Sequence, residues 1–210
     1  MKLIHKTFTI LSTLALGSGV FVSSNAFLAP TVLAQPAPMV LATLTQQEFN
    51  QILQTQPQTA EDYYDQGLAL QGAGNLEGAI RSFSEAVKLS GTADNYFARG
   101  LALSDLGDHK QAIADYNVAI RLDPNFAAAF YNRGMARLAL QDQTGAIADL
   151  SQAIKLDSSF VAAYYSRGLA YYNAGNEKLA RQDYNMAVRL SPGMISAYYN
   201  LSQQYQTGGN

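Results

Sequence analysis

The sequence predicts an all-α fold, a solenoid of stacked helix-turn-helix units, because small and large residues recur at one fixed period. The period is 33 or 34 residues, and it is kept by four glycines: Gly67, Gly100, Gly134 and Gly168. Alanine recurs in the same register at two further places: Ala79, Ala112, Ala146 and Ala180, then Ala86, Ala119, Ala153 and Ala187. An aromatic residue keeps the period as well, at Tyr63, Tyr96, Phe130, Tyr164 and Tyr198. Such a period is typical of repeat proteins, whose units bury their apolar faces only by stacking on neighbours.

Residues 1–34 predict a secretory signal peptide. Lys2 and Lys6 precede an apolar run over residues 8–22, and no further charged residue follows before Glu48. A basic start and an apolar middle are the features of an export signal. We therefore expect an exported protein, located in the periplasm, in a thylakoid lumen or outside the cell.

Two cleavage sites fit the signal peptide. Cleavage after Ala34 is preferred, because a proline-containing stretch typical of a mature linker starts at Gln35; cleavage after Ala26 is the alternative. A cleaved chain has no stable membrane insertion. An uncleaved N-terminus that anchors the chain in a membrane is the other possibility, although Pro30 interrupts the apolar stretch.

The segments on both sides of the repeats predict caps. Residues 35–59 form a linker with a short helix, in which Thr45 and Glu48 have capping-box spacing. We interpret this helix as a cap on the first repeat; the alternative is a tethered segment that occupies the protein's own groove. Residues 195–210 predict a partial repeat that serves as a C-terminal cap helix, with Ser202 at the place of the recurring glycine.

Four full units are expected over residues 60–92, 93–126, 127–160 and 161–194. The second unit illustrates the pattern: its first helix ends near a turn at Gly107, and Asp108 with Gln111 has the spacing of a capping box. The second helix then spans residues 109–122 and stops before Pro124, which cannot continue a helix. Each unit is therefore a helix-turn-helix.

This pattern resembles the tetratricopeptide repeat, a helix-turn-helix unit of about 34 residues. The resemblance rests in the second unit on Tyr96, Gly100, Leu103, Ala112, Tyr116, Ala119 and Pro124, with equivalents in the other units. The sequence departs from the family pattern at Arg137, where a large apolar residue is usual, and at Gly78 and Gly145 in two second helices. The resemblance implies a right-handed α-solenoid that binds other proteins without catalysing a reaction.

Charged residues also follow the repeat. Three arginines each precede an aspartate by 16 residues: Arg99 and Asp115, Arg133 and Asp149, Arg167 and Asp183. The first unit has uncharged residues at both places, Gln66 and Ser82. Charge is thus present at both places or at neither, which predicts a structural ion pair between the two helices of each unit. Three aligned arginines that bind an acidic ligand are the alternative.

The composition argues against an enzyme. The chain has no cysteine and two histidines, of which His5 falls in the signal, and its charged residues give a net charge of −2. No cluster has metal-ligand spacing, no glycine-rich loop suits a phosphate, and no basic stripe suits nucleic acid. We expect no catalytic residue, no cofactor and no metal.

By analogy with the family, the first helix of each unit lines a concave groove. The residues expected there are Tyr64, Phe97, Tyr131, Asn132, Met135, Tyr165, Leu169 and Tyr199; the alternative is that some of them pack between neighbouring repeats. Tyrosine and methionine are common at partner surfaces, so an apolar peptide or an amphipathic helix fits this groove. The lysines, arginines and asparagines with which family members grip a chaperone's C-terminal carboxylate are replaced by Tyr64, Leu68, Ala98, Ala128 and Asn132. We therefore expect no carboxylate clamp.

These observations predict an exported, non-enzymatic protein–protein interaction scaffold, an adaptor or an assembly factor. Two alternatives stay open from the sequence. One is a self-assembling structural protein whose C-terminal end stacks onto another copy. The other is a small-ligand or glycan-binding module that uses the tyrosines.

Overall fold

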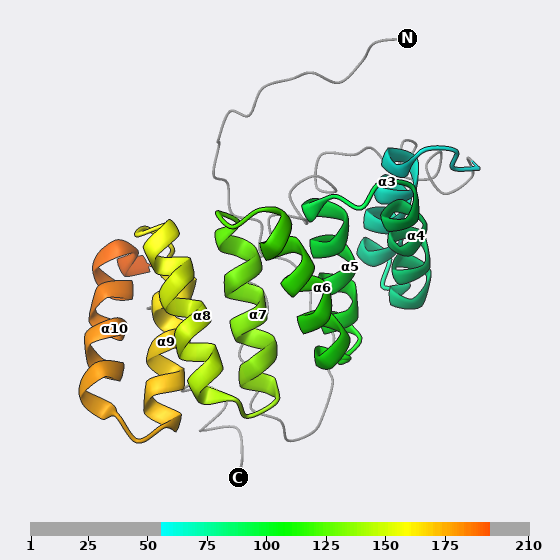
Figure 1. Cartoon of the computed structure of the whole chain (residues 1–210). Coiled ribbons are helices and arrows are strands. Elements are labelled where there is room, and N and C mark those ends of the chain that lie inside the picture. The colour runs from blue at the N-terminus through cyan, green and yellow to red at the C-terminus, as the bar shows by residue number, and fades with distance from the viewer. Residues whose placement is uncertain (1–55, 194–210) are drawn as a thin grey trace. The chain divides into compact units, whose positions relative to one another are not determined.

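A computed structural model describes residues 56–193, which form eight α-helices arranged as four consecutive pairs (Figure 1). The first helices of the pairs are α3 (Ala60–Gly72), α5 (Ala93–Asp105), α7 (Ala127–Ala139) and α9 (Val161–Asn173). The second helices are α4 (Leu76–Leu89), α6 (His109–Leu122), α8 (Gln143–Leu156) and α10 (Glu177–Leu190). No strand occurs between residues 56 and 193, so the predicted all-α fold of helix-turn-helix units is confirmed.

Several predictions fall outside the described residues. These are the signal peptide of residues 1–34, the short helix before residue 56, and the partial repeat that contains Tyr199. In the described part of the chain, no helix combines the length and the apolar character that a membrane span requires.

The second helix of every pair begins at an Asn or Asp cap. In each case the side-chain oxygen accepts a hydrogen bond from the backbone N–H three residues later, as it does in Asn75, Asp108, Asp142 and Asn176. A free N–H group at the helix start is thereby satisfied. The same cap in all four units gives every turn the same geometry.

The turn before each cap contains a residue in the left-handed region. Glycine provides it three times, for example Gly107 with φ 91°, and Gln141 takes it in the third unit with φ 65°. A residue with a side chain adopts this conformation at a cost that glycine avoids. The third turn therefore keeps the repeat geometry although its sequence departs from the pattern.

Each unit has its own core between its two helices. Phe83, Tyr116 and Leu150, at equivalent places in the first three second helices, are fully buried. A Cβ atom added at Gly100 would lie 2.7 Å from the ring of Tyr116, so the recurring glycine is what lets the two helices approach. The recurring alanines of α4, α6, α8 and α10 are buried in the same cores.

Neighbouring pairs stack through both kinds of helix. α4 packs on α5, α6 on α7, and α8 on α9. The first helices also contact one another in sequence, α3 with α5, α5 with α7, and α7 with α9. The first helices therefore form one continuous layer, and this layer carries the residues predicted to bind a partner.

Candidate binding surface

Three of the aromatic residues predicted for the groove, Tyr64, Phe97 and Tyr165, pack on an aromatic ring of the second helix of their own unit. Ring centroids lie 5.7 Å apart for Tyr64 and Phe83, and 5.4 Å apart for Tyr165 and Tyr184. Such separations are typical of favourable aromatic pairs. These contacts fix the orientation of each aromatic side chain on the first-helix layer.

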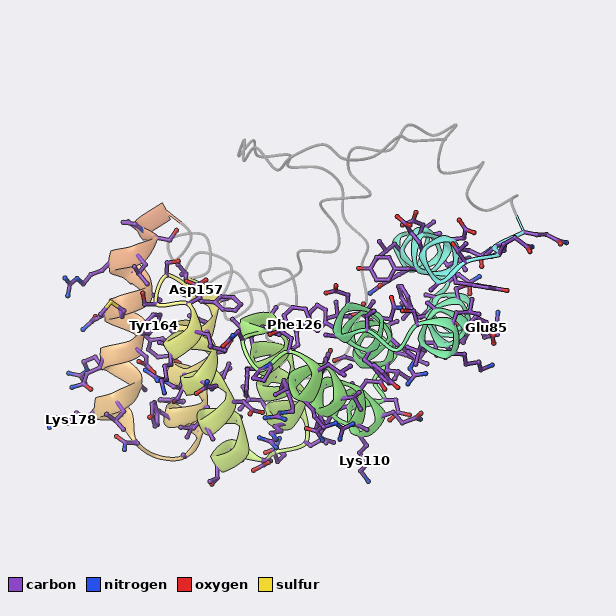
Figure 2. All side chains as sticks on the ribbon, turned by 45° about the horizontal axis from the view of Figure 1, so that its top comes forward. Glu85, Lys110, Phe126, Asp157, Tyr164 and Lys178 are labelled. Carbon is purple, nitrogen blue, oxygen red and sulfur yellow. The ribbon has the colours of Figure 1, made fainter. Side chains whose placement is uncertain are left out.

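Phe97 and Tyr131 lie between units and not on an open surface. Only 6% of Phe97 and 5% of Tyr131 is exposed. Phe126 stands at the start of α7 (Figure 2) and stacks on Phe97 at 4.6 Å; Phe160 stacks on Tyr131 at 4.9 Å. Burial raises the pKa of the Tyr131 hydroxyl, which lies 3.4 Å from the hydroxyl oxygen of Ser166. Both side chains thus serve contact between repeats.

The other predicted groove residues keep part of their surface. Tyr64, Asn132, Met135, Tyr165 and Leu169 are half-buried. The side-chain amide of Asn132 donates to the backbone carbonyl of residue 128 in its own helix at 2.8 Å, which leaves its oxygen for a partner.

Tyr172 is the exposed member of this surface that the sequence prediction missed. It is 60% exposed on α9 and follows Tyr165 by two helical turns and Leu169 by one, so the three share one side of the helix. Leu138 of α7 and Tyr172 of α9 are equivalent residues, each one helical turn after a predicted groove residue. Extending the predicted surface by one turn in each unit would have found Tyr172. We use the name apolar stripe for Met135, Leu138, Tyr165, Leu169 and Tyr172.

The apolar stripe is uncharged at neutral pH. Burial, and then the neighbouring Tyr165 and Tyr172, raise the pKa of the Tyr184 hydroxyl beneath it to about 12. Toward the N-terminal end the layer becomes polar: on α3 and α5, Gln71 and Ser104 stand at the places of Leu138 and Tyr172. The amide of Gln71 donates to Asp105 at 2.6 Å, which links the two helices.

The three repeating arginines form bidentate ion pairs within their own units. Arg99 donates from Nε and Nη2 to the two carboxylate oxygens of Asp115, both at 2.7 Å. Arg133 with Asp149 and Arg167 with Asp183 have the same geometry, at 2.6 to 2.9 Å. Each aspartate side chain is nearly buried. An acidic ligand would have to displace these aspartates in order to bind the arginines.

Each arginine also reaches the preceding unit, which the spacing did not predict. The third nitrogen, Nη1, donates to the second helix of the unit before: Arg99 to Ser84 at 3.4 Å, Arg133 to Asn117 at 2.6 Å, and Arg167 to Ser151 at 3.0 Å. Each guanidinium therefore joins three helices and fixes the register between units. In the first unit, the hydroxyl of Ser82 donates to Gln66 at 2.8 Å instead.

Arg137, the departure from the family pattern, is accommodated by the same aspartate as Arg133. Its Nη1 donates to Asp149 at 2.8 Å and to the backbone carbonyl of Gly145 at 3.1 Å. A Cβ atom added at Gly145 would lie 2.9 Å from the arginine side chain. The same Cβ atom would come closer still to the carboxylate of the cap residue Asp142, as one at Gly78 would to the cap residue Asn75, so Gly145 leaves room for its cap as well as for Arg137.

The described residues carry little that suits catalysis. No group of three or more His, Cys, Asp or Glu side chains within residues 56–193 could hold a metal ion. His109 lies near Ser104, with 3.4 Å between Nδ1 and the hydroxyl oxygen. The apolar, uncharged character of the stripe suits binding, not proton transfer.

Comparison with known proteins supports the repeat assignment. Residues 100–141 and 134–175 match a family model described as TPR repeat, and residues 161–193 match one described as tetratricopeptide repeat. No curated protein matches the chain in sequence.

Solved structures show the same fold. MamA residues 41 to the end from Desulfovibrio magneticus RS-1 has a TM-score of 0.66 at 18% identity, over 74% of this chain and 91% of that one. YrrB, described as a TPR protein with an unusual peptide-binding site, has a TM-score of 0.62 at 20% identity, over 79% and 84%. The first TPR of Spaghetti (RPAP3), bound to HSP90 peptide SRMEEVD, has a TM-score of 0.50 at 26% identity, over 58% and 96%. The chain therefore contains tetratricopeptide repeats, matched in sequence over residues 100–193 and continued in the same helix-turn-helix form from residue 60.

Proposed function

We propose that the protein is a non-enzymatic interaction scaffold, an adaptor or assembly factor, that binds an apolar peptide or amphipathic helix along α7 and α9. The observation that carries the proposal is the apolar stripe, which ends in a tyrosine that is 60% exposed. An exposed aromatic beside partly exposed Leu and Met is the composition of a partner surface. The description of YrrB as having a peptide-binding site, on the same fold, supports a peptide as the partner.

The chemistry of the stripe favours an apolar partner over an acidic one. The peptide bound to Spaghetti ends in Glu-Glu-Val-Asp, whereas the stripe contains no lysine or arginine. A carboxylate buried on this surface would lose its hydration without gaining a cation, which is costly. The arginines of α7 and α9, Arg133, Arg137 and Arg167, are already held by aspartates. No carboxylate clamp is therefore expected on α7 and α9.

The rigidity of the layer supports tight binding by few residues. Tyr165 is fixed by its contact with Tyr184, and α7 and α9 are held in register by the arginine contacts. A surface that is already ordered loses little conformational entropy when a partner docks. A few aromatic anchors can then supply most of the binding free energy.

The change Tyr172→Ser tests the proposal, because it removes the most exposed anchor without touching a core. Leu122→Ser is the matched control: it removes an apolar residue that is 50% exposed at the end of α6, away from the stripe. Peptides selected from a random library on the wild-type protein are titrated against both variants by fluorescence anisotropy. We expect apolar peptides whose Kd rises roughly tenfold or more in Tyr172→Ser and stays unchanged in Leu122→Ser. Selection of no peptide, or equal binding by both variants, would count against the stripe.

We also propose that the protein acts after export. The proposal rests on the basic start and apolar run of residues 1–34. The intact mass of the protein purified from its host tests it: a chain that begins at Gln35, or at Phe27 for the alternative site, supports export. A chain that still begins at Met1 in the soluble fraction argues against it.

A further inference from the structure

The contacts between units mark which side of a second helix meets the next unit. Ser84, Asn117 and Ser151 accept hydrogen bonds from the arginine of the following unit. One turn earlier on the same side stand isoleucines, at residues 80, 113 and 147. Ile80 packs against clusters that include α5, and Ile113 against one that includes α7. In the first three pairs, this side of the second helix therefore carries an isoleucine and, four residues later, a Ser or Asn that accepts a hydrogen bond.

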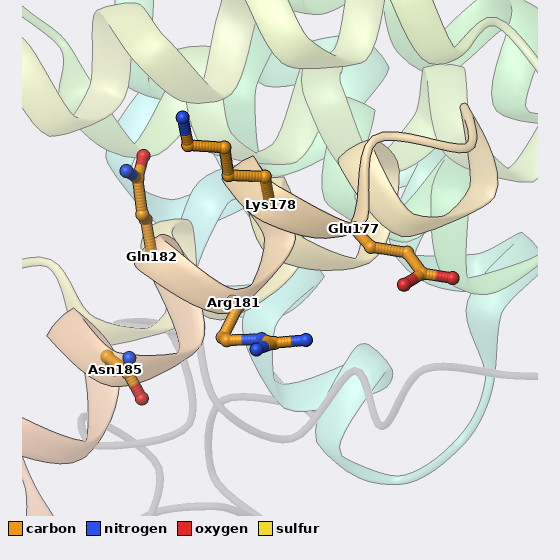
Figure 3. A pocket seen from close by; sticks show the side chains of 5 residues that line it. All are labelled: Glu177, Lys178, Arg181, Gln182 and Asn185. Atoms are coloured by element: carbon orange, nitrogen blue, oxygen red, sulfur yellow. The ribbon is translucent and has the colours of Figure 1, made fainter.

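α10 carries a different residue on this side. Arg181 stands 34 residues after Ile147, and Asn185 stands 34 residues after Ser151. Both are exposed, as are Glu177, Lys178 and Gln182 around them on α10 (Figure 3). Lys178 extends away from the helix into solvent (Figures 2 and 3). The side that is apolar in earlier units is therefore basic and polar here.

The opposite end of the solenoid shows the complementary change. Inside it, a first helix meets the preceding unit through Asn95, whose amide donates to the carbonyl of Ser90 at 2.6 Å, and through Ala98, which is 3% exposed. On α3 the residues 33 positions earlier are Asp62 and Asp65. Both are exposed. The side that elsewhere receives a preceding unit is therefore acidic in the first pair.

Among residues 56–193, no ion pair compensates the charge of the Asp65 carboxylate. Although the residue is exposed at the surface, neighbouring atoms remove part of the hydration of the Asp65 carboxyl; this, and then the negative charges of Glu61 and Asp62, raise its pKa. Asp62 differs, because its carboxylate accepts from the backbone N–H groups of Gln58 and Thr59 and caps α3. A cation placed beside Asp65 would offset this repulsion and favour the charged carboxylate.

The net charges of the first and the last unit also differ, with an acidic first unit and a basic last unit. Residues 60–92 contain five acidic and two basic residues, whereas residues 161–194 contain two acidic and four basic ones. The first and the last unit therefore carry opposite net charge. Complementary potentials of this kind steer association and fix its register.

We propose that a second copy of the chain stacks head to tail, its α3 against the α10 of the first, with Arg181 beside Asp65. The internal geometry supplies the register: Ile80 packs against the cluster that contains Ala98, and Arg181 and Asp65 are the equivalents of these two residues. Asn185 has the repeat position of Ser84, and Gln66 has that of Arg99. In this register the two side chains meet as an uncharged amide pair. This contact is heterologous, so it continues from copy to copy and does not close as a dimer.

A charge-reversal series on the full chain tests the proposal. The weight-average mass is measured by sedimentation or light scattering over a range of concentrations, at about 50 mM and about 1 M salt. We expect the wild-type mass to rise with concentration beyond that of a dimer at low salt, and to fall at high salt. Arg181→Glu and Asp65→Lys each weaken association about tenfold, because each places like charges opposite one another. The double variant restores it. Arg121→Glu, exposed on α6, makes the same charge change as Arg181→Glu and leaves association unchanged.

Three results would overturn the proposal. The first is a wild-type mass that stays monomeric at all concentrations at low salt. The second is a double variant that associates no better than the single ones. The third is an Arg181→Glu or Asp65→Lys variant with a lower Tm and an unchanged mass. It would mean that the chain's own flanking segments cover these faces, residues 194–210 on α10 or the predicted helix within residues 35–59 on α3. None of these results bears on the apolar stripe, whose test is peptide binding.

Discussion

At the scale of single residues, the close contact of the two helices in a unit depends on what faces the recurring glycine. In the second unit the neighbour is the ring of Tyr116, which is fully buried and would lie 2.7 Å from an added Cβ atom of residue 100. In the third unit the neighbour is Leu150, whose nearest atom would lie 3.0 Å from a Cβ atom of residue 134. A buried ring cannot turn away, whereas a shift of a few tenths of an ångström relieves the leucine contact. The two glycines therefore differ in how strictly they are required.

The pair Gly100→Ala and Gly134→Ala tests this difference. Overpacking costs about 1–3 kcal/mol, and alanine gains about 1 kcal/mol over glycine inside a helix. The closer contact at Gly100 places its overpacking in the upper half of this range, so we expect Gly100→Ala to lower the free energy of unfolding by about 1–2 kcal/mol, and Gly134→Ala to stay within about 1 kcal/mol of wild type. Urea unfolding followed by circular dichroism measures both. Equal effects of the two changes would show that the facing side chain does not matter.

Residue spacing predicted some side-chain contacts and missed others for a physical reason. The 16-residue interval placed each arginine opposite its aspartate, because both positions recur in every unit. The contact from Arg133 back to Asn117 was missed, since Ser and Asn alternate at that place and show no charge pattern. The burial of Phe97 was missed as well. It depends on Phe126, which lies outside any helix pattern at the cap of α7.

At the scale of helices, the two kinds of start differ. Second helices begin at Asn or Asp caps, which the sequence showed. α7 and α9 begin at Phe126 and Phe160, whose side chains make no cap hydrogen bond. Their rings instead pack on Phe97 and Tyr131 of the preceding unit. At these two positions, the side chain therefore stabilises the contact between units and does not cap the helix.

Phe126→Asn shows which effect is larger. An Asn cap gains about 1 kcal/mol, whereas removing a buried phenylalanine costs about 3–5 kcal/mol, and less for a ring that is half-buried. We expect a net loss of about 1–3 kcal/mol in the free energy of unfolding. Phe126→Leu, which keeps apolar bulk without a cap, should lie closer to wild type. The interpretation fails if Asn proves as stable as Leu in the same denaturant titration.

At the scale of the whole molecule, periodicity predicted the architecture but not which of the equivalent side chains are exposed. The number and order of helices over residues 60–190 follow from the recurring Gly, Ala and aromatic residues, because each unit repeats the same packing problem. The accessible part of the surface could not be read from the period: Tyr131 and Tyr165 are equivalent in sequence, yet one is buried and the other half-buried. Phe160 covers Tyr131, whereas the equivalent of Phe160 for Tyr165 is residue 194, which lies outside the described residues.

Nearest-neighbour stacking also predicts how the molecule opens. Opening α3 and α4 breaks one interface with a neighbouring described pair, whereas opening α7 and α8 breaks two, with α6 and with α9. In a solenoid stability is the sum of unit and interface contributions, so central helices should open less often. We expect native-state hydrogen exchange to be at least about tenfold slower in α5–α8 than in α3, α4, α9 and α10. The Phe126→Asn variant is the internal check, because weakening the contact between α5 and α7 should bring the exchange of α5 and α6 closer to that of the ends. Uniform protection in all eight described helices would instead mean that the units unfold as one body, and that the contacts between units are stronger than those within them.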